Sequence, residues 1–155
     1  MKSIAQELSQ HPFFDGLCDD YLQCMLSCSK NTRFPSGRVI ATEGSAANEF
    51  FVITKGRVAL QLHSSPAATL LIQTLDAGDI LGWSWLFPPY RWSVEAMAVQ
   101  DVQVIAVDGS CLRDKCDADP VMGYQLMQRF SRLMSQRIEA TRLQLLDLYG
   151  QGRNP

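Results

Sequence analysis

Residues 34–60 read FPSGRVIATEGSAANEFFVITKGRVAL, and they combine short apolar runs with spaced glycines at positions 37, 44 and 56. Each run is too short for a helix of ordinary length. Glycine adopts positive φ angles without a steric penalty, so it suits the tight turns that join antiparallel strands. The tetrapeptide TKGR at 54–57 is typical of such a hairpin turn. The stretch therefore predicts consecutive β-strands.

The same pattern of short apolar runs separated by glycines extends from residue 33 to residue 108. Apolar runs recur at 70–75, 94–99 and 102–107, and Val58, Leu60 and Leu62 alternate with polar or small residues. About eight short strands at this spacing are typical of an antiparallel barrel or roll. We expect one mainly β domain over 1–155: an antiparallel β-roll (a double-stranded jelly roll) over 33–108, with helices within 1–31 and 110–150.

A long helix is expected after the roll. Asp119-Pro120 marks its start, because proline is favoured at the first helical position. Leu126, Phe130 and Leu133 form one apolar stripe along it. Gly150 and the glycine at 152 are expected to end it.

This helix would be about 45 Å long at 1.5 Å per residue, which is more than a roll of this size needs for cover. It is therefore expected either to break near Ser135 or to pack its distal half on a second copy. The second case predicts a homodimer that uses Ile138, Leu145 and Leu148.

The chain has 155 residues, 46% of them hydrophobic, and a formal net charge of −2. This composition predicts a folded core and gives no electrostatic reason to bind nucleic acid. The N-terminus lacks a secretory apolar run, and no stretch reaches the roughly 18 apolar residues of a spanning helix. We expect a cytoplasmic protein with no membrane partner.

Five cysteines without a signal peptide indicate free thiols. Cys24 and Cys28 are four residues apart and would share one helical face. They are interpreted as small buried residues. A metal or redox role is the alternative, although no CxxC pair supports it.

Residues 78–96, GDILGWSWLFPPYRWSVEA, predict a binding pocket. A short helical turn after Gly82 would direct backbone N–H groups inward, and Arg91 would add a guanidinium from a neighbouring strand. Together these groups suit a small anion.

The side chains of this segment leave two interpretations open. Trp83, Trp85 and Trp92 lie within ten residues of one another, and they would either stack on a planar base or fill the mouth of the roll. Ser84 and Ser93 would either bind a phosphate or serve as ordinary turn residues.

In this order of parts the chain resembles the cyclic nucleotide-binding domain of the catabolite activator and Fnr-like regulators, without a DNA-binding domain. The matching segments are HPFFDGL (11–17), the 34–60 stretch, LDAGDILG (75–82) and DVQVIAVDGSCLRDKCDADP (101–120). The resemblance implies that cAMP, cGMP or another phosphorylated small molecule rests its phosphate against the turn at 82–86. It also implies an acid directly after the glycine for the ribose, and a phosphate-binding arginine on the next strand.

The chain departs from this pattern at the ligand positions. Trp83 stands in place of the acid, and an indole only donates hydrogen bonds. Either Tyr90 or Arg91 takes the place of the phosphate arginine, and the strand register is left open. Glu95 replaces the acid only if it faces inward. The candidate ligand-binding residues are Gly82, Trp83, Ser84, Trp85, Tyr90, Arg91, Trp92 and Ser93.

Two functions are expected from these observations. The first is a regulatory sensor module that binds a small anionic or nucleotide-like ligand and signals through its C-terminal helix, with a protein effector as partner. The alternative is a degenerate interaction or dimerisation module whose pocket is plugged by tryptophan.

Catalysis and direct DNA binding are not expected. The only histidines, His11 and His63, are poorly placed to hold a metal together, and no nucleophilic triad appears. Only five residues follow Gly150, too few for a recognition helix. Basic residues on the long helix are interpreted as a solvated face: Arg129, Arg132, Arg137 and Arg142.

Overall fold

The structure is a computed structural model that describes residues 2–153. Eight strands form two four-stranded sheets, in the orders β1-β8-β3-β6 and β2-β7-β4-β5, and every pairing is antiparallel. The strands are β1 (Ser29–Phe34), β2 (Val39–Ala41), β3 (Glu49–Lys55), β4 (Arg57–Ser65), β5 (Ala68–Asp76), β6 (Ile80–Leu81), β7 (Glu95–Ala98) and β8 (Val102–Asp108). The β-roll expected from the sequence is confirmed.

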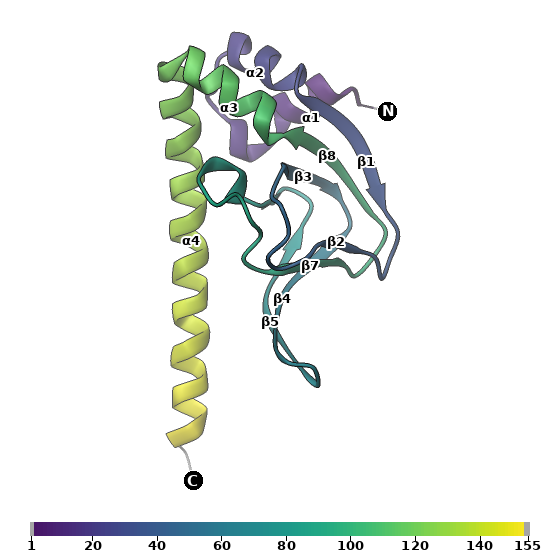
Figure 1. The fold of residues 1–155 in the computed structure, drawn as a ribbon, viewed down its shortest axis with the longest axis vertical. Helices are drawn as coiled ribbons and strands as arrows, with labels where there is room; N and C mark the ends of the chain where they lie inside the picture. The colour runs from purple at the N-terminus through teal and green to yellow at the C-terminus, as the bar shows by residue number, and fades with distance from the viewer. Residues whose placement is uncertain (1, 154–155) are drawn as a thin grey trace.

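The helices gather at one end of the roll, and the last of them runs along its side (Figure 1). They are α1 (Ile4–Gln10), the 3₁₀ turns η1 (Pro12–Phe14) and η2 (Ser84–Leu86), α2 (Asp19–Leu26), α3 (Gly109–Ala118) and α4 (Pro120–Arg153). Asp119 caps α4 by accepting a hydrogen bond from the Met122 N–H, with Pro120 in the first helical position. None of the described helices combines the length and apolar composition that crossing a bilayer requires.

Alternation along β3 divides the interior into two cores. Phe50 and Val52 pack with residues of the helices, including Phe130 of α4. Phe51 and Ile53 point to the other face and pack inside the roll. Because successive strand residues face opposite sides, one strand serves both cores.

Two element boundaries differ from the sequence expectation. The first strand begins at Ser29, inside the segment expected to be helical, because residues 29–34 pair with β8 along its length. The last helix is unbroken at Ser135 and continues past Gly150 to Arg153. A glycine inside a helix costs only about 1 kcal/mol, and no proline follows Pro120 within α4 to break it.

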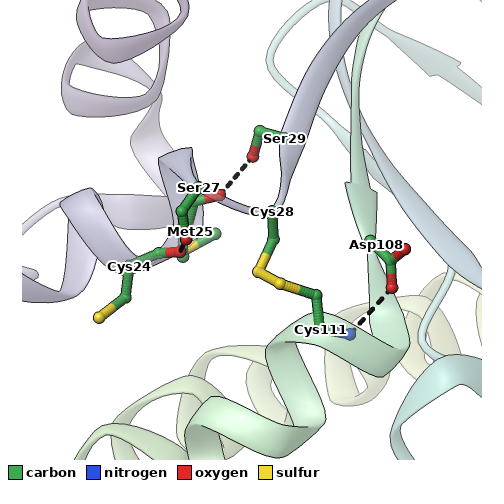
Figure 2. The surroundings of a disulfide bond; sticks show 7 residues. All are labelled: Cys24, Met25, Ser27, Cys28, Ser29, Asp108 and Cys111. Atoms are coloured by element: carbon green, nitrogen blue, oxygen red, sulfur yellow. Dashed lines mark hydrogen bonds between the residues drawn. A yellow bond between two sulfur atoms is a disulfide. The ribbon is translucent and has the colours of Figure 1, made fainter.

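The expectation of free thiols is wrong for two of the five cysteines. Cys28 and Cys111 form a disulfide that joins the start of β1 to the first turn of α3 (Figure 2). Cys28 lies beyond the end of α2, so it does not share a helical face with Cys24, which points away from this bond. Cys18, Cys24 and Cys116 are free. The two bonded positions are 83 residues apart, so spacing alone could not reveal the pair.

Candidate functional site

A cavity of about 420 Å³ lies between the roll and α4. We call it the roll–helix cavity. Strands β4, β5 and β6, the turn before η2, the segment before β7 and the middle of α4 all contribute to its wall. Its aliphatic lining consists of Leu60, Ile72, Leu81, Val94, Ile138 and Leu145.

Gly82 and Trp92 shape one side of the roll–helix cavity together. Gly82 has a φ of +100°, a conformation that L side chains rarely adopt. A Cβ placed there would lie 2.6 Å from Cη2 of Trp92. Trp92 also stacks on Phe51 of the roll core, with ring centroids 6.3 Å apart. Glycine at position 82 therefore lets a large indole close this side of the cavity.

Arg137 of α4 is the buried cation of the roll–helix cavity. Its residue is 8% exposed, and it donates a hydrogen bond through Nη2 to the Ile80 carbonyl. Its Cζ lies 4.9 Å from the ring centroid of Trp83, a cation–π contact. Burial lowers the pKa of Arg137 to about 10, and Asp79 opposes this shift. The side chain stays charged at neutral pH.

The remaining polar groups of the wall are neutral or already paired. Gln73, Ser84, Ser93 and Thr141 offer amide and hydroxyl groups. Arg142 donates to Glu139 across one helical turn, with Nη2 and Oε1 2.8 Å apart. Among the residues that the structure describes, none that lines the cavity is an aspartate or glutamate. Among the described lining residues, Arg137 is therefore the one charged side chain without a carboxylate partner, and it comes from α4.

Five of the eight candidate residues line the roll–helix cavity: Gly82, Trp83, Ser84, Trp92 and Ser93. The other three, Trp85, Tyr90 and Arg91, lie outside it. That the five bind a ligand stays a prediction. The structure brings them together at the wall opposite α4.

Trp85 belongs to the core that the helices share with β3. It is fully buried, stacks on Phe50 with centroids 5.1 Å apart, and meets the ring of Phe130 edge-on. A Cβ at Gly109 would lie 2.8 Å from the Trp85 Cβ, so α3 also begins against it. Trp85 therefore fixes η2 on the helical core rather than filling the cavity.

Arg91 does not stand at the head of a strand, because β7 begins only at Glu95. It forms an isolated bridge with Ala46, and its exposed side chain donates to the Gly44 carbonyl over 2.9 Å. Tyr90 before it has a left-handed φ of 55°, and its ring stacks against Arg113. Neither side chain reaches the roll–helix cavity.

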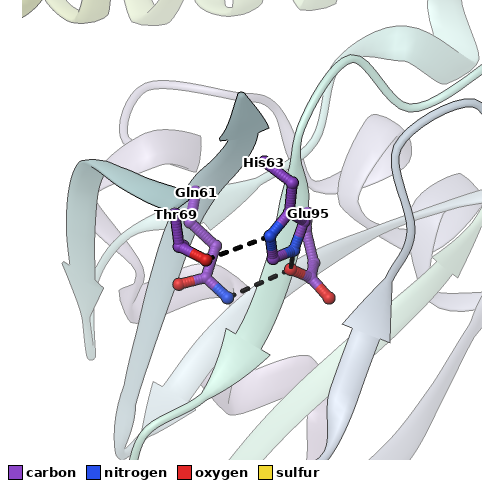
Figure 3. Close-up of polar contacts among 4 residues, drawn as sticks. All are labelled: Gln61, His63, Thr69 and Glu95. Carbon is purple, nitrogen blue, oxygen red and sulfur yellow. Dashed lines mark hydrogen bonds and ion pairs between the residues drawn. The ribbon is translucent and has the colours of Figure 1, made fainter. Parts of the chain in front are cut away.

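Glu95 is held by a polar cluster on β4, β5 and β7, away from the cavity lining (Figure 3). Its Oε2 accepts from Nε2 of Gln61 at 3.0 Å and pairs with Nε2 of His63. The other ring nitrogen of His63 lies 3.0 Å from the Thr69 hydroxyl. Glu95 therefore does not replace the missing acid.

Arg137 is the residue that sequence reasoning missed, because it was counted with the solvated arginines of the helix. A signal was present. Arg137 continues the apolar stripe of Leu126, Phe130 and Leu133 at the next step of four residues. On a straight helix that spacing faces the core.

Comparison with known proteins agrees with this architecture. The chain is 27% identical to a protein from Geobacter metallireducens GS-15 described as cyclic nucleotide-binding, over 88% of this chain and 99% of that one, with a TM-score of 0.79. A cyclic nucleotide-binding domain from Methylobacillus flagellatus KT has the same fold, with 17% identity, coverage of 93% and 81%, and a TM-score of 0.78.

A curated relative, the CRP-like cAMP-activated global transcriptional regulator of Mycobacterium tuberculosis, is 21% identical over 141 residues, or 91% of this chain. The chain spans 61% of that relative's length. The family model for the cyclic nucleotide-binding domain matches residues 31–119, more than half of the chain. The chain therefore belongs to the cyclic nucleotide-binding domain family.

Proposed function

We propose that the chain is a regulatory sensor domain that binds a small anionic, nucleotide-like ligand in the roll–helix cavity. The observation that carries this proposal is the cavity itself, whose wall is shared between the roll and α4. Concave, mostly apolar sites with a few polar groups are the usual binding sites for small molecules. The cyclic mononucleotides cAMP and cGMP are the first ligands to test, because the chain belongs to their binding family.

The proposed signal passes through α4. Arg137, Ile138 and Leu145 of this helix lie in the cavity wall opposite Trp92 of the roll. A ligand that touches both walls would favour whichever placement of α4 gives the better contacts. The ligand would shift the equilibrium between positions of α4 by as much as its affinities for those positions differ. An effector protein would then read the position of α4.

The proposed assembly is a dimer through α4. A row of positions on this helix alternates steps of three and four residues, the spacing of a coiled-coil seam. The row is Tyr124, Met127, Ser131, Met134, Ile138, Thr141, Leu145 and Leu148. Ile138 and Leu148 are 69% and 61% exposed in the single chain. A second copy of the same seam would cover these apolar side chains, because a parallel pair of identical helices is self-complementary.

The alternative, a module with a tryptophan-plugged pocket, is not favoured. Trp85 packs in the helical core and Trp92 in the roll core, and a cavity of about 420 Å³ remains between the roll and α4. A plugged pocket would leave no such volume.

Calorimetric titration with cAMP and cGMP tests the proposed function. Wild type is expected to bind at least one of them, and Ile72→Trp is expected to abolish binding because Ile72 lines the cavity. Leu71→Trp is the matched control, because Leu71 is next to Ile72 in the chain but is exposed and does not line the cavity. Equal binding by both variants would contradict a ligand site in the roll–helix cavity. No binding of either compound by wild type would contradict a cyclic mononucleotide as the ligand.

A further inference from the structure

Arg137 has far more hydrogen-bonding capacity than its surroundings use. A guanidinium carries five N–H donors in a fixed plane. One of them is donated to the Ile80 carbonyl. None of the ion pairs among residues 2–153 involves Arg137, and the cavity lining holds no carboxylate.

Removing the unpaired guanidinium of Arg137 from water costs free energy, and its contacts offset this desolvation only in part. The cation–π contact with Trp83 and the bond to the Ile80 carbonyl stabilise the guanidinium. Neither supplies a counter-charge, and Asp79, which attracts the guanidinium and opposes the lowering of its pKa, forms no ion pair with it. The residue is only 8% exposed, and it lines a cavity. A charged group held in this way is a candidate anion-binding group, because an incoming anion gains a strong bond at a position already desolvated.

The rest of the wall favours an apolar body. Trp83 and Trp92 present flat aromatic surfaces, and the aliphatic lining surrounds them. A sugar with several hydroxyls is best held by carboxylates and amides. Within the described part of the chain, the lining offers one side-chain amide, Gln73, and no acid.

We infer that the cavity takes a flat, largely apolar molecule carrying one carboxylate or phosphate, with the anionic group bound by Arg137 and the ring against Trp83 and Trp92. This inference rests on the proposed function, because it assumes that the roll–helix cavity is a ligand site. It differs from a nucleotide site with its cation on the roll, since the charge comes from α4. The occupant thus bridges α4 and the roll.

Matched probes test the charge directly. The probes are 2-naphthoate, 2-naphthyl phosphate and the neutral 2-naphthamide, each titrated into the full chain by calorimetry, with cAMP alongside. A hydrogen-bonded charge pair contributes about 1.5–3 kcal/mol, which corresponds to a preference of roughly tenfold or more for at least one anion over the amide. The anion that binds better distinguishes a carboxylate from a phosphate ligand.

The variant Arg137→Gln is expected to reduce that preference to less than about threefold, since only neutral hydrogen bonds remain. Arg137→Lys keeps the charge and is expected to retain part of the preference for the anion over the amide. Arg132→Gln is the matched control, because Arg132 is an exposed arginine of the same helix outside the cavity lining. It should leave the preference unchanged.

The outcomes separate the inference from the proposed function. Equal binding of anions and amide by wild type would overturn the inference without any variant, so it stays testable if Arg137→Gln fails to fold. Binding of cAMP with no binding of the naphthalene anions would overturn the inference and leave the proposed function standing. No binding by any probe would overturn both.

Discussion

The guanidinium of Arg137 lies over the indole of Trp83, with Cζ 4.9 Å from the ring centroid. The two residues belong to different parts of the fold, α4 and the turn before η2. Their contact therefore joins the long helix to the roll within the wall of the roll–helix cavity. We expect Arg137 to favour the binding of an anionic ligand while adding little or nothing to the stability of the fold.

Replacing Arg137 by methionine is expected to leave the free energy of unfolding unchanged within about 1 kcal/mol, or to raise it. A well-packed apolar side chain often stabilises a site from which a buried charge has been removed. Urea denaturation followed by tryptophan fluorescence measures this.

Arg129→Met is the control with the opposite expectation. The Arg129 guanidinium donates to the carbonyls of Phe13 and Asp15, at 3.1 and 2.7 Å, and so ties the N-terminal segment to α4. Its loss is expected to cost about 2 kcal/mol. A loss of similar size for Arg137→Met would contradict our view that Arg137 is kept for binding.

Gly82→Ala is expected to lower the free energy of unfolding by about 3 kcal/mol, from left-handed strain and from the clash with Trp92. Gly78→Ala isolates the strain, because Gly78 has a similar φ of +96° and nothing within 4 Å of its added Cβ. Its expected cost is about 1–2 kcal/mol. Thermal unfolding of the two variants compares them, and equal costs would show that Trp92 moves aside freely.

His11 is expected to make the fold less stable in mild acid. Its Nδ1 accepts the Phe13 N–H, and burial lowers its pKa from 6.5, with Asp79 opposing the shift. The unfolded chain therefore binds the proton more readily, so stability is full above the unfolded pKa and falls as the pH drops through the lower folded pKa.

His11→Asn keeps a capping acceptor without the titration. The unfolding free energies of wild type and this variant are compared from about pH 7 to about pH 4.5. Wild type should lose more stability than the variant as the pH falls. A difference that does not vary with pH would show that His11 does not titrate differently in the two states.

The Cys28–Cys111 disulfide is expected to stabilise the fold by about 2–4 kcal/mol, because it closes a long loop in the unfolded chain. Cys111→Ser should lose this amount, whereas Cys18→Ser, at an exposed free cysteine, should lose almost none. In denaturant without reductant, a thiol-reactive chromophore should count three thiols, and with prior reduction all five. A count of five in both cases would contradict the pairing.

Leu148→Glu is expected to convert a dimer into a monomer, because Leu148 lies on the seam of α4 and outside the lining of the roll–helix cavity. Leu143→Glu is the control, since Leu143 is also exposed but lies away from the seam. Sedimentation velocity measures both masses. A monomeric wild type, or loss of the dimer in both variants, would count against the seam.

The roll and the long helix could be predicted from sequence because their signals are local. Glycines such as Gly56, with φ of +97°, mark hairpin turns, and Asp119-Pro120 marks a helix start. The disulfide and the early start of β1 depend on contacts with residues about 80 positions away, and no local pattern encodes them.

The candidate site could be predicted only in part, because it too depends on contacts between residues far apart in the sequence. The sequence predicts a pocket at the turn from Gly82 to Ser84, and these residues line the roll–helix cavity. It also predicts that Arg91 supplies a cation there, but the side chain of Arg91 instead donates to the Gly44 carbonyl. Arg137 arrives from α4, more than fifty residues later, and only the packing of the helix on the roll brings it to the site.

Nuclear magnetic resonance can show directly where a small molecule sits on this chain. In a titration with cAMP and with 2-naphthoate, we expect the backbone amide signals of Gly82, Ser84, Ser93 and Thr141 to shift together. Those of Val39 and Leu70, which are exposed and do not line the roll–helix cavity, should stay in place. Shifts confined to residues outside the cavity lining, or none with either compound at saturating concentration, would contradict a ligand site between the roll and α4.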